Sequence, residues 1–225
     1  MDQNLFNYND EDIDSVIEYS HKLLNRKFSD VMEEYGNYIE KYFYGYQPNS
    51  DSEADFEKIG VELKVTPFKI NKNGTLSAKE RLVLTILNYM EENLEDFYST
   101  HLWKKCAKIL LLFYNGLIPN QTMKDYVIEK IFLYEWFEED MAVILEDYQK
   151  ITDKIKNGKA HELSESDGNY LSTCTKGAGK GKDLRQQPFS HELAKQRAWE
   201  LKSSYMTYLI NHKIFNQSDQ ESVLA

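Results

Sequence analysis

The sequence has only two cysteines, Cys106 and Cys174, and no apolar run long enough to cross a membrane. Two cysteines make neither a disulfide framework nor a zinc-ligand cluster, which favours a reducing, cytoplasmic location. The longest apolar run, ILLLFY at 109–114, is far shorter than the ~20 residues that span a bilayer. The acidic start MDQNLFNYNDEDID lacks the basic and then apolar order of a signal peptide. We therefore expect no membrane partner.

The chain is also short of basic residues, with 27 Lys and Arg against 37 Asp and Glu and a formal net charge of −10. This deficit lies in residues 1–57, which hold fourteen acids and four bases. Residues 176–213 are the reverse, with eight bases and three acids. A chain polarised in this way can present a positive surface to phosphate while staying acidic overall, so nucleic acid is not excluded as a partner.

The length of 225 residues suits one large domain or two lobes around a cleft. Helical spacing of apolar residues predicts helices over 11–28, 30–44 and 138–158, and another within 191–215. β-prone runs predict strands over 58–70, 81–87, 107–114 and 126–136, with a hairpin turn at NKNGT joining the first two. The polar segment 161–188 is expected to be loop or hairpin. This order predicts an α/β fold that borders on α+β.

The segment VELKVTPF, residues 61–68, places Glu62 and Lys64 on one face of a strand, because residues two apart point the same way. Asp55 lies seven residues before Glu62, across the short turn EKIG, and Glu40 lies at the end of the preceding helix. Carboxylates that converge near a strand end can hold Mg²⁺, which activates a bound water and neutralises phosphate charge. A nearby lysine can position that water or stabilise the phosphorus transition state. The spacing predicts phosphodiester hydrolysis; a surface strand with one ion pair, worth about 0.5 kcal/mol, stays open as the alternative.

A second acid-x-lysine triplet, Glu200-Leu201-Lys202, has no hairpin and no upstream acid at a comparable distance. We interpret it as a solvated face or a phosphate contact. The segment KGAGKGKD at 176–183 lacks the P-loop spacing and has Asp183 where a hydroxyl is needed. We interpret it as a flexible basic loop that contacts backbone phosphates.

Six segments carry a resemblance by occurring together and in order. They are DFEKIGVELKVTPFK, KERLVL, GKAHELSE, CTKGA, the Gln187-Pro188 turn and KQRAWELKSSYMT. Over residues 30–215 they resemble the MutH group of Mg²⁺-dependent endonucleases acting at GATC, and within it the Sau-type restriction enzymes. The resemblance implies a restriction-endonuclease-like core of the PD-(D/E)xK type, with a mixed sheet flanked by helices and a two-lobed cleft.

The resemblance also implies roles for individual residues. Asp55, Glu62 and Lys64 match the family's catalytic acid, acid and lysine. Glu40 matches a glutamate on the helix beneath the site, and Lys105 matches a further lysine near the scissile phosphate. The implied Mg²⁺ ligands are Asp55, Glu62 and Leu63.

Base reading is implied for Lys176 in CTKGA, together with its neighbour Gly177. The repair enzyme carries an arginine two residues before that lysine, whereas this chain has Cys174, so base readout and methylation response are expected to differ. Segment 161–170 is the next candidate for reading bases. Phosphate contacts are expected from Lys180, Lys182, Arg185 and Lys202.

We therefore expect a Mg²⁺-dependent type II restriction endonuclease that cuts double-stranded DNA 5′ of the G in GATC, in a bacterial cytoplasm. A strand-nicking endonuclease of mismatch repair and a non-catalytic GATC-binding module remain alternatives. The expected organisation is an N-terminal helical segment (1–28), a catalytic lobe (29–136), a DNA-reading lobe (137–215) and a tail (216–225). Sau-type enzymes carry a second MutH-like half, so such a half or a second copy is a candidate partner on DNA.

Overall fold

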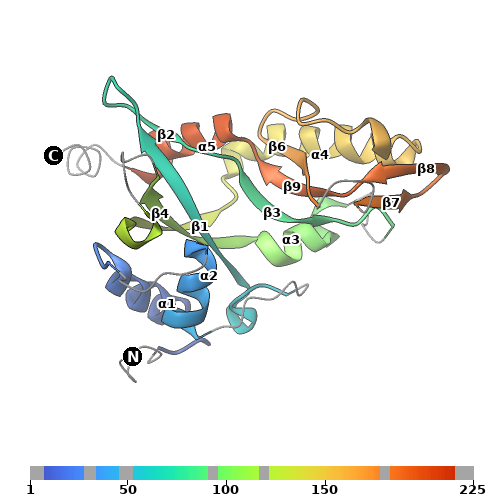
Figure 1. Cartoon of the computed structure of the whole chain (residues 1–225). Helices are drawn as coiled ribbons and strands as arrows, with labels where there is room; N and C mark the ends of the chain where they lie inside the picture. Colours follow the sequence, from blue (N-terminus) through green and yellow to red (C-terminus); the bar gives the residue numbers. More distant parts are fainter. Residues whose placement is uncertain are drawn as a thin grey trace. The chain divides into compact units, whose positions relative to one another are not determined.

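The computed structural model describes residues 8–27, 34–45, 53–90, 96–116, 122–177 and 183–215 (Figure 1). The chain divides into two compact units. Unit 1 comprises Met1–Glu80, Lys108–Glu135 and Thr207–Ala225, and unit 2 comprises Arg81–Ala107 and Trp136–Met206. The chain thus enters unit 2 twice, whereas the sequence suggested consecutive lobes divided after residue 136.

Unit 1 contains a mixed four-stranded sheet in the order β2-β1-β4-β5. The central pair is parallel and the outer pairs are antiparallel. In the parallel pair, Glu62 of β1 lies opposite Ile109 of β4, and Lys64 lies opposite Leu111. The strands are β1 (Val61–Ile70), β2 (Leu76–Ala78), β4 (Lys108–Asn115) and β5 (Ile128–Glu135).

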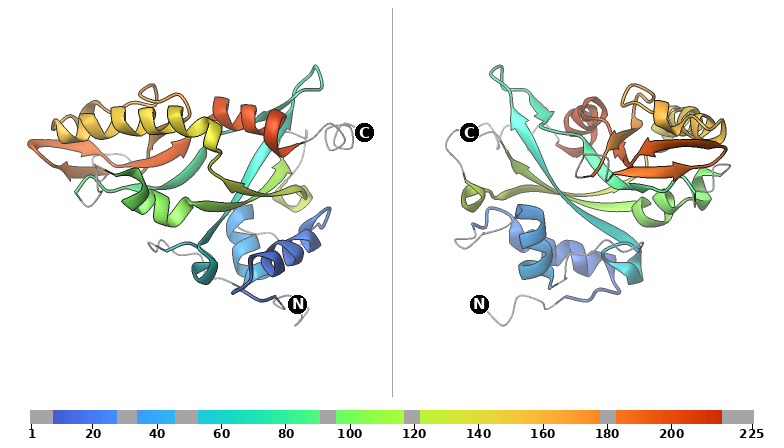
Figure 2. Two further views of the ribbon diagram at one scale, coloured as in Figure 1. Left: turned by 180° about the vertical axis from the view of Figure 1, so that it is seen from behind. Right: turned by 45° about the vertical axis from the view of Figure 1, so that its right-hand side comes forward.

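Two helical elements of unit 1 cover one face of this sheet, as the two views of Figure 2 show. Helix α1 (Ile13–Ser20) begins at Asp12, whose carboxylate accepts a hydrogen bond from the N–H of Asp14. Helix α2 (Tyr35–Ile39) continues as a π-helical segment, Glu40–Tyr44, and ends at Gly45 with a left-handed φ of 79°. Both helices lie within the predicted ranges, and residues 28–33 fall outside the described part.

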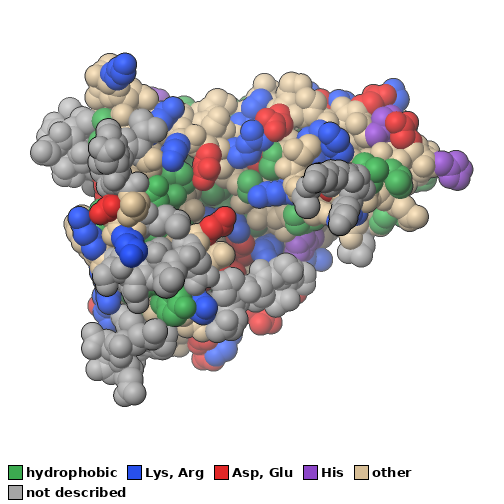
Figure 3. All heavy atoms as spheres, in the orientation of Figure 1, with side chains coloured by type: hydrophobic (Ala, Val, Ile, Leu, Met, Phe, Trp, Pro, Cys, Tyr) green, Lys and Arg blue, Asp and Glu red, His purple; other side chains and the backbone are tan. Residues whose placement is uncertain are grey.

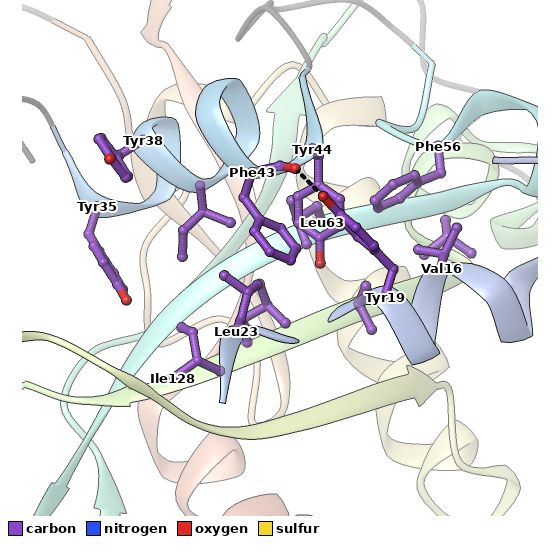
Figure 4. Close-up of a cluster of buried hydrophobic side chains, with 14 residues drawn as sticks. Val16, Tyr19, Leu23, Tyr35, Tyr38, Phe43, Tyr44, Phe56, Leu63 and Ile128 are labelled. Atoms are coloured by element: carbon purple, nitrogen blue, oxygen red, sulfur yellow. Dashed lines mark hydrogen bonds between the residues drawn. The ribbon is translucent and has the colours of Figure 1, made fainter. Parts of the chain in front are cut away.

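The core of unit 1 forms between these helices and the apolar face of β1 (Figure 4). Val61 and Leu63 point into it, as the alternation along the strand predicts. The hydroxyl of Tyr19 donates to the carbonyl of Phe43 at 3.0 Å, so this aromatic cluster also satisfies its polar atoms. Its buried members are Val16, Tyr19, Leu23, Tyr35, Tyr38, Ile39, Phe43, Tyr44, Phe56, Val61, Leu63, Leu110, Leu112 and Ile128.

Unit 2 contains an antiparallel sheet in the order β3-β9-β6 and a two-stranded ribbon, β7-β8. Helix α4 (Met141–Lys156) packs on β6, and the ring of Tyr148 stacks on Trp199 at 5.6 Å. The other helices are α3 (His101–Cys106) and α5 (Ser203–Leu209), which passes into unit 1 and continues as a π-helical segment, Ile210–Ile214. The strands are β3 (Leu82–Leu87), β6 (Leu171–Thr175), β7 (Leu184–Gln187), β8 (Ser190–Lys195) and β9 (Arg197–Leu201).

Short 3₁₀ turns connect these elements, and they are His21–Leu23, Glu57–Ile59, Phe97–Ser99, Met123–Asp125, Glu138–Asp140 and Ala160–Glu162. Among the described residues, no helix combines the length and apolar character needed to cross a bilayer. The prediction of a mixed sheet flanked by helices is confirmed.

Two predictions of local structure are wrong. The strand predicted over 81–87 exists as β3 but does not pair with β1, because β2 takes that position after the NKNGT turn and β3 pairs with β9 instead. The segment 161–188 was expected to be loop or hairpin, and it contributes β7 to the β7-β8 hairpin but also contains strand β6; the helix predicted within 191–215 is present as α5, but strands β8 and β9 precede it. Strand β9 is buried at every residue and therefore lacks the alternation that reveals a strand in sequence.

Candidate active site

A tight turn folds Asp55 back onto the start of β1. The N–H of Phe56 donates to the carbonyl of Val61 at 2.9 Å, and the N–H of Val61 donates to the carbonyl of Phe56 at 3.3 Å. The 3₁₀ turn between them ends at Gly60, whose φ of 62° is left-handed and favours glycine. The buried ring of Phe56 anchors this turn in the core of unit 1. The short EKIG turn predicted from the sequence is therefore present.

Asp55 lies beside the acid-x-lysine triplet of β1. Its Oδ2 accepts a hydrogen bond from the main-chain N–H of Leu63 at 2.9 Å. Leu63 is the residue between Glu62 and Lys64, so the three candidate catalytic residues gather at the start of one strand. The sequence spacing of seven residues thus corresponds to proximity in space.

Glu62 and Lys64 form an ion pair on the face of β1 opposite the core cluster. Lys64 Nζ lies 2.5 Å from Glu62 Oε1. The Glu62 side chain is 2% exposed and that of Lys64 is 25% exposed. A carboxylate buried to this degree is costly unless it is paired and hydrogen-bonded, and Lys64 supplies a charged donor. A surface ion pair would leave both side chains exposed to solvent, so the burial of Glu62 argues against that alternative.

The donor set at this strand fits a hard divalent cation. Asp55 and Glu62 supply carboxylates, and the carbonyl of Leu63 adds a main-chain oxygen on the same strand. Mg²⁺ commonly binds through one or two carboxylates and keeps several waters. Within the described residues, no group of three or more His, Cys, Asp or Glu side chains is placed to hold a metal ion.

Two further catalytic candidates lie outside this strand. Glu40 begins the π-helical segment that follows α2 in unit 1 and is half-buried. Lys105 is a buried residue of α3 in unit 2. Their catalytic roles stay predictions.

The candidate base-reading residues follow strand β6 in unit 2. The N–H of Lys176 donates to the carbonyl of Gln196 at 2.9 Å, which fixes the start of the loop on the β8–β9 connection. Gly177 has a left-handed φ of 135°, and a Cβ atom there would lie 2.5 Å from Cβ of Asp183. Glycine is thus required at this position by both conformation and space. The predicted phosphate contacts Lys180 and Lys182 lie outside the described residues.

Two other predicted DNA contacts are described. Arg185 is exposed on β7, and its Nη1 donates to the carbonyl of Leu184 at 2.9 Å. Lys202 donates to the carbonyls of Glu165 and Gly168 at 3.1 and 3.0 Å. Lys202 therefore has an internal role as a tether, whatever it contributes on DNA.

The interpretation of Glu200 as part of a solvated face is wrong. Its side chain is 2% exposed, and its Oε2 lies 3.1 Å from Nη1 of Arg81. Arg81 also pairs with Glu165. Burial raises the pKa of Glu200 above its ordinary value, with Arg81 acting in the opposite direction. Burial also raises the pKa of the Cys174 thiol, which hydrogen-bonds to Glu200.

The sequence interpretation missed a buried carboxylate that organises the entry to β6. Asp147 of α4 is fully buried and accepts hydrogen bonds from the main-chain N–H groups of Asn169, Tyr170 and Leu171, at 2.7 to 3.1 Å. A signal for it was present, because Asp147 falls on the apolar face of α4 that Ile144 defines.

A buried guanidinium was missed as well. Arg197 of β9 donates to the carbonyls of Leu163 and Thr173 and so joins the segment before β6 to β6 itself. Local sequence gave no indication of these partners, because Leu163 lies 34 residues and Thr173 lies 24 residues before Arg197.

Residues 44–147 match the family model described as DNA mismatch repair enzyme MutH. Its mixed sheet, and the hydrogen bond that holds Asp55 of the preceding turn against the strand carrying Glu62 and Lys64, agree with a MutH-like, restriction-endonuclease-like α/β fold. At the level of a particular protein, the chain is similar to the type II restriction enzyme Sau3AI of Staphylococcus aureus, with 41% identity over 191 residues. That alignment covers 84% of this chain and 38% of the relative, so the chain spans well under half of that enzyme's length. The resemblance inferred from sequence is confirmed.

Proposed function

We propose that this chain is the nuclease portion of a type II restriction endonuclease and that it hydrolyses double-stranded DNA at GATC, 5′ of the G, with Mg²⁺. The observation that carries the proposal is the hydrogen bond from Leu63 to Asp55 beside the Glu62–Lys64 ion pair. A non-catalytic binding module would have no need to keep a buried carboxylate, a second carboxylate and a lysine together.

Asp55 and the residues of β1 have separate roles in phosphodiester hydrolysis. Asp55 and Glu62 would hold Mg²⁺ through carboxylate oxygens, with the carbonyl of Leu63 as a further ligand. When bound, Mg²⁺ supplies charge neutralisation at the phosphate and lowers the pKa of a coordinated water. The Lys64 ammonium, held in place by Glu62, orients the attacking water and stabilises the negative charge that develops on phosphorus-bound oxygen. The water oxygen bonds to phosphorus and loses a proton to solvent, while one bridging P–O bond breaks and its oxygen leaves as a hydroxyl after taking up a proton.

Burial keeps this arrangement ready before DNA binds. Glu62 lies in the sheet opposite Ile109, and Asp55 is fixed by the main chain rather than by a mobile side chain. Such preorganisation places the charged groups where charge develops, without a reorganisation cost during the reaction. Glu40 is proposed to support the site from the π-helical segment Glu40–Tyr44, and Lys105 is proposed to contact the scissile phosphate.

DNA recognition is assigned to unit 2. Lys176 and Gly177 are proposed to meet base edges, and Lys180, Lys182, Arg185 and Lys202 are proposed to contact phosphates, which set register and carry no sequence information. Because the chain spans 38% of its Sau3AI relative, a second copy or a further MutH-like half is a proposed partner on DNA.

Digestion of supercoiled plasmid tests this function. Wild-type protein with Mg²⁺ should give linear product from a plasmid containing GATC and no product when EDTA replaces Mg²⁺. Open-circular product alone would instead support the alternative of a strand-nicking enzyme, which the match to the MutH family model suggests. Retarded but uncut plasmid would support a binding module. Running the digest on adenine-methylated and unmethylated plasmid shows which state of the site is cut.

A further inference from the structure

Unit 2 contains a hollow of about 230 Å³ beside the proposed base-reading loop. It lies between the end of β3 and the β7–β8 ribbon, and the hydroxyl of Tyr89 closes one wall by donating to the carbonyl of Lys195 at 2.7 Å. Burial raises the pKa of Tyr89 to about 12, which keeps this hydroxyl a donor at neutral pH. The residues that matter below are Ile86, Tyr89, Met90, Arg185, Gln186 and Gln196.

Part of the hollow is lined by apolar side chains that are exposed to solvent. Ile86 and Met90 are 45% and 59% exposed, although both are large apolar side chains. The β3 strand and the residues after it thus present apolar surface at a place where the fold does not bury it. Ile86 and Met90 thus place exposed apolar atoms at the same hollow as the polar side chains of Arg185, Gln186 and Gln196.

The hollow also has amide groups with open hydrogen-bonding capacity. Within the described part of the chain, neither Gln186 nor Gln196 uses its side-chain amide in a hydrogen bond. The neighbouring Gln187 behaves differently, because its amide is buried and bonds to Ala160, His161 and Glu192. Glutamine on this ribbon therefore serves two purposes, one inside the fold and one facing the hollow.

Gln196 connects the hollow to the proposed base-reading loop. Its carbonyl accepts from the N–H of Lys176 at 2.9 Å, and its own N–H donates to the carbonyl of Asp183 at 2.6 Å. Main-chain bonds thus hold Gln196 to both sides of the segment between Lys176 and Asp183. The main chain of Lys176 is therefore a direct hydrogen-bond neighbour of Gln196, so the hollow and the start of the proposed base-reading loop lie in one part of unit 2.

An A·T base pair has the chemistry that fits such a surface. In the major groove it presents adenine N7 and N6–H₂, which a glutamine amide can meet with two hydrogen bonds, and beside them the thymine methyl, which apolar side chains contact. A two-stranded ribbon is narrow enough to enter that groove. Figure 3 shows Lys and Arg side chains over the part of the molecule where Figure 1 labels β3, β6 and β9, and Arg185 at the hollow adds positive charge toward phosphate.

We propose that this hollow reads the two inner A·T base pairs of the target, with the amides of Gln186 and Gln196 each on one adenine and with Ile86 and Met90 on the thymine methyl groups. This inference rests on the proposed function, since it needs duplex DNA at the loop of Lys176. It assigns the two inner base pairs of GATC to the hollow and leaves the guanine to Lys176.

Binding to base analogues tests the proposal, with Ca²⁺ in place of Mg²⁺ and at fixed salt. The duplexes carry GATC, a scrambled site, GATC with 7-deazaadenine, or GATC with deoxyuridine for thymine. Wild-type protein should lose about tenfold in affinity on removal of adenine N7 and a smaller factor on removal of the methyl group. The double variant Gln186→Ala/Gln196→Ala should bind GATC about 5- to 150-fold more weakly, bind the scrambled duplex unchanged, and no longer sense 7-deazaadenine.

Met90→Ala should lose the response to deoxyuridine and keep the response to 7-deazaadenine. The matched controls are Gln149→Ala, whose amide binds Asp153 in α4, and Leu193→Ala, an exposed apolar residue of β8. Both controls should behave as wild type on all four duplexes.

The outcomes separate the two proposals. Wild-type protein that binds GATC and scrambled DNA equally would overturn the proposed function itself. Wild-type protein that prefers GATC, combined with a glutamine double variant that still senses 7-deazaadenine, would overturn only the role of the hollow. A variant that binds no duplex is checked by thermal unfolding, and a folded variant with uniformly weak binding would also overturn the base-reading role.

Discussion

The main-chain N–H of Leu63 donates a hydrogen bond to the carboxylate of Asp55 at 2.9 Å. This contact brings a residue of the preceding turn to the strand that carries Glu62 and Lys64, and it does so through the backbone. The position of the Asp55 carboxylate therefore depends on the turn at Gly60 and on the packing of Phe56.

Lys64 should act on the transition state rather than on binding. Lys64→Ala should lower kcat by about 10²- to 10³-fold, because a preorganised charge is lost at the reacting phosphate. DNA affinity in Ca²⁺ should change little. Lys69→Ala, on the same strand, is the matched control and should keep its turnover. Equal loss of turnover in both variants would show that Lys64 has no special position.

Lys176 should carry sequence information. Lys176→Ala should cost about 1–3 kcal/mol in binding at GATC and little at a scrambled duplex. Arg185→Ala should weaken binding to both duplexes alike and reduce the salt slope by about one unit, as loss of a phosphate contact does. An unchanged ratio of the two affinities in Lys176→Ala would move the reading role to segment 161–170.

Part of this site could be predicted from local sequence. The strand β1, its turn at Asn73-Gly74 and the acid spacing all depend on residues close in the chain, so their patterns survive in the sequence. Strand β9 could not be predicted in this way. It contains Arg197 and Glu200, which look like surface residues until Leu163, Thr173 and Arg81 provide their partners.

The prediction that residues 200–202 form a solvated face is wrong for the same physical reason. A buried charge is acceptable only when distant groups satisfy it, and those groups are set by the topology of the sheet. Asp147 illustrates the point, since its three main-chain donors lie more than twenty residues further along the chain.

Lys202 should contribute to stability. Lys202→Ala should lower the free energy of unfolding by about 1–3 kcal/mol, because two carbonyls lose a charged donor. Urea unfolding measures this change, and Lys195→Ala, an exposed lysine of β8, should have little effect. Wild-type stability in Lys202→Ala would contradict the tether between β9 and the segment before β6.

Glu200 should make stability depend on pH. Its pKa is raised by burial, so between its ordinary value of 4.5 and the raised value the folded protein holds a proton that the unfolded chain has released. Stability should therefore fall as pH rises through this window. Glu200→Gln lacks this titration, so the unfolding free energy of the variant minus that of wild type should increase from pH 4 to pH 7. A difference that stays constant or decreases would mean that attraction to Arg81 outweighs burial.

The carboxylates of Asp55 and of Glu62 in β1 test the central claim most directly. The measurement is cleavage of a GATC plasmid in Mg²⁺ by wild type, Asp55→Asn and Glu62→Gln, with Glu57→Gln as an exposed control from the same turn. Binding to a GATC duplex in Ca²⁺ is followed in parallel. Both site variants should lose cleavage by at least about 10³-fold while still binding DNA, and Glu57→Gln should cut as wild type does. Full cleavage by Glu62→Gln would contradict the assignment of this strand as the active site.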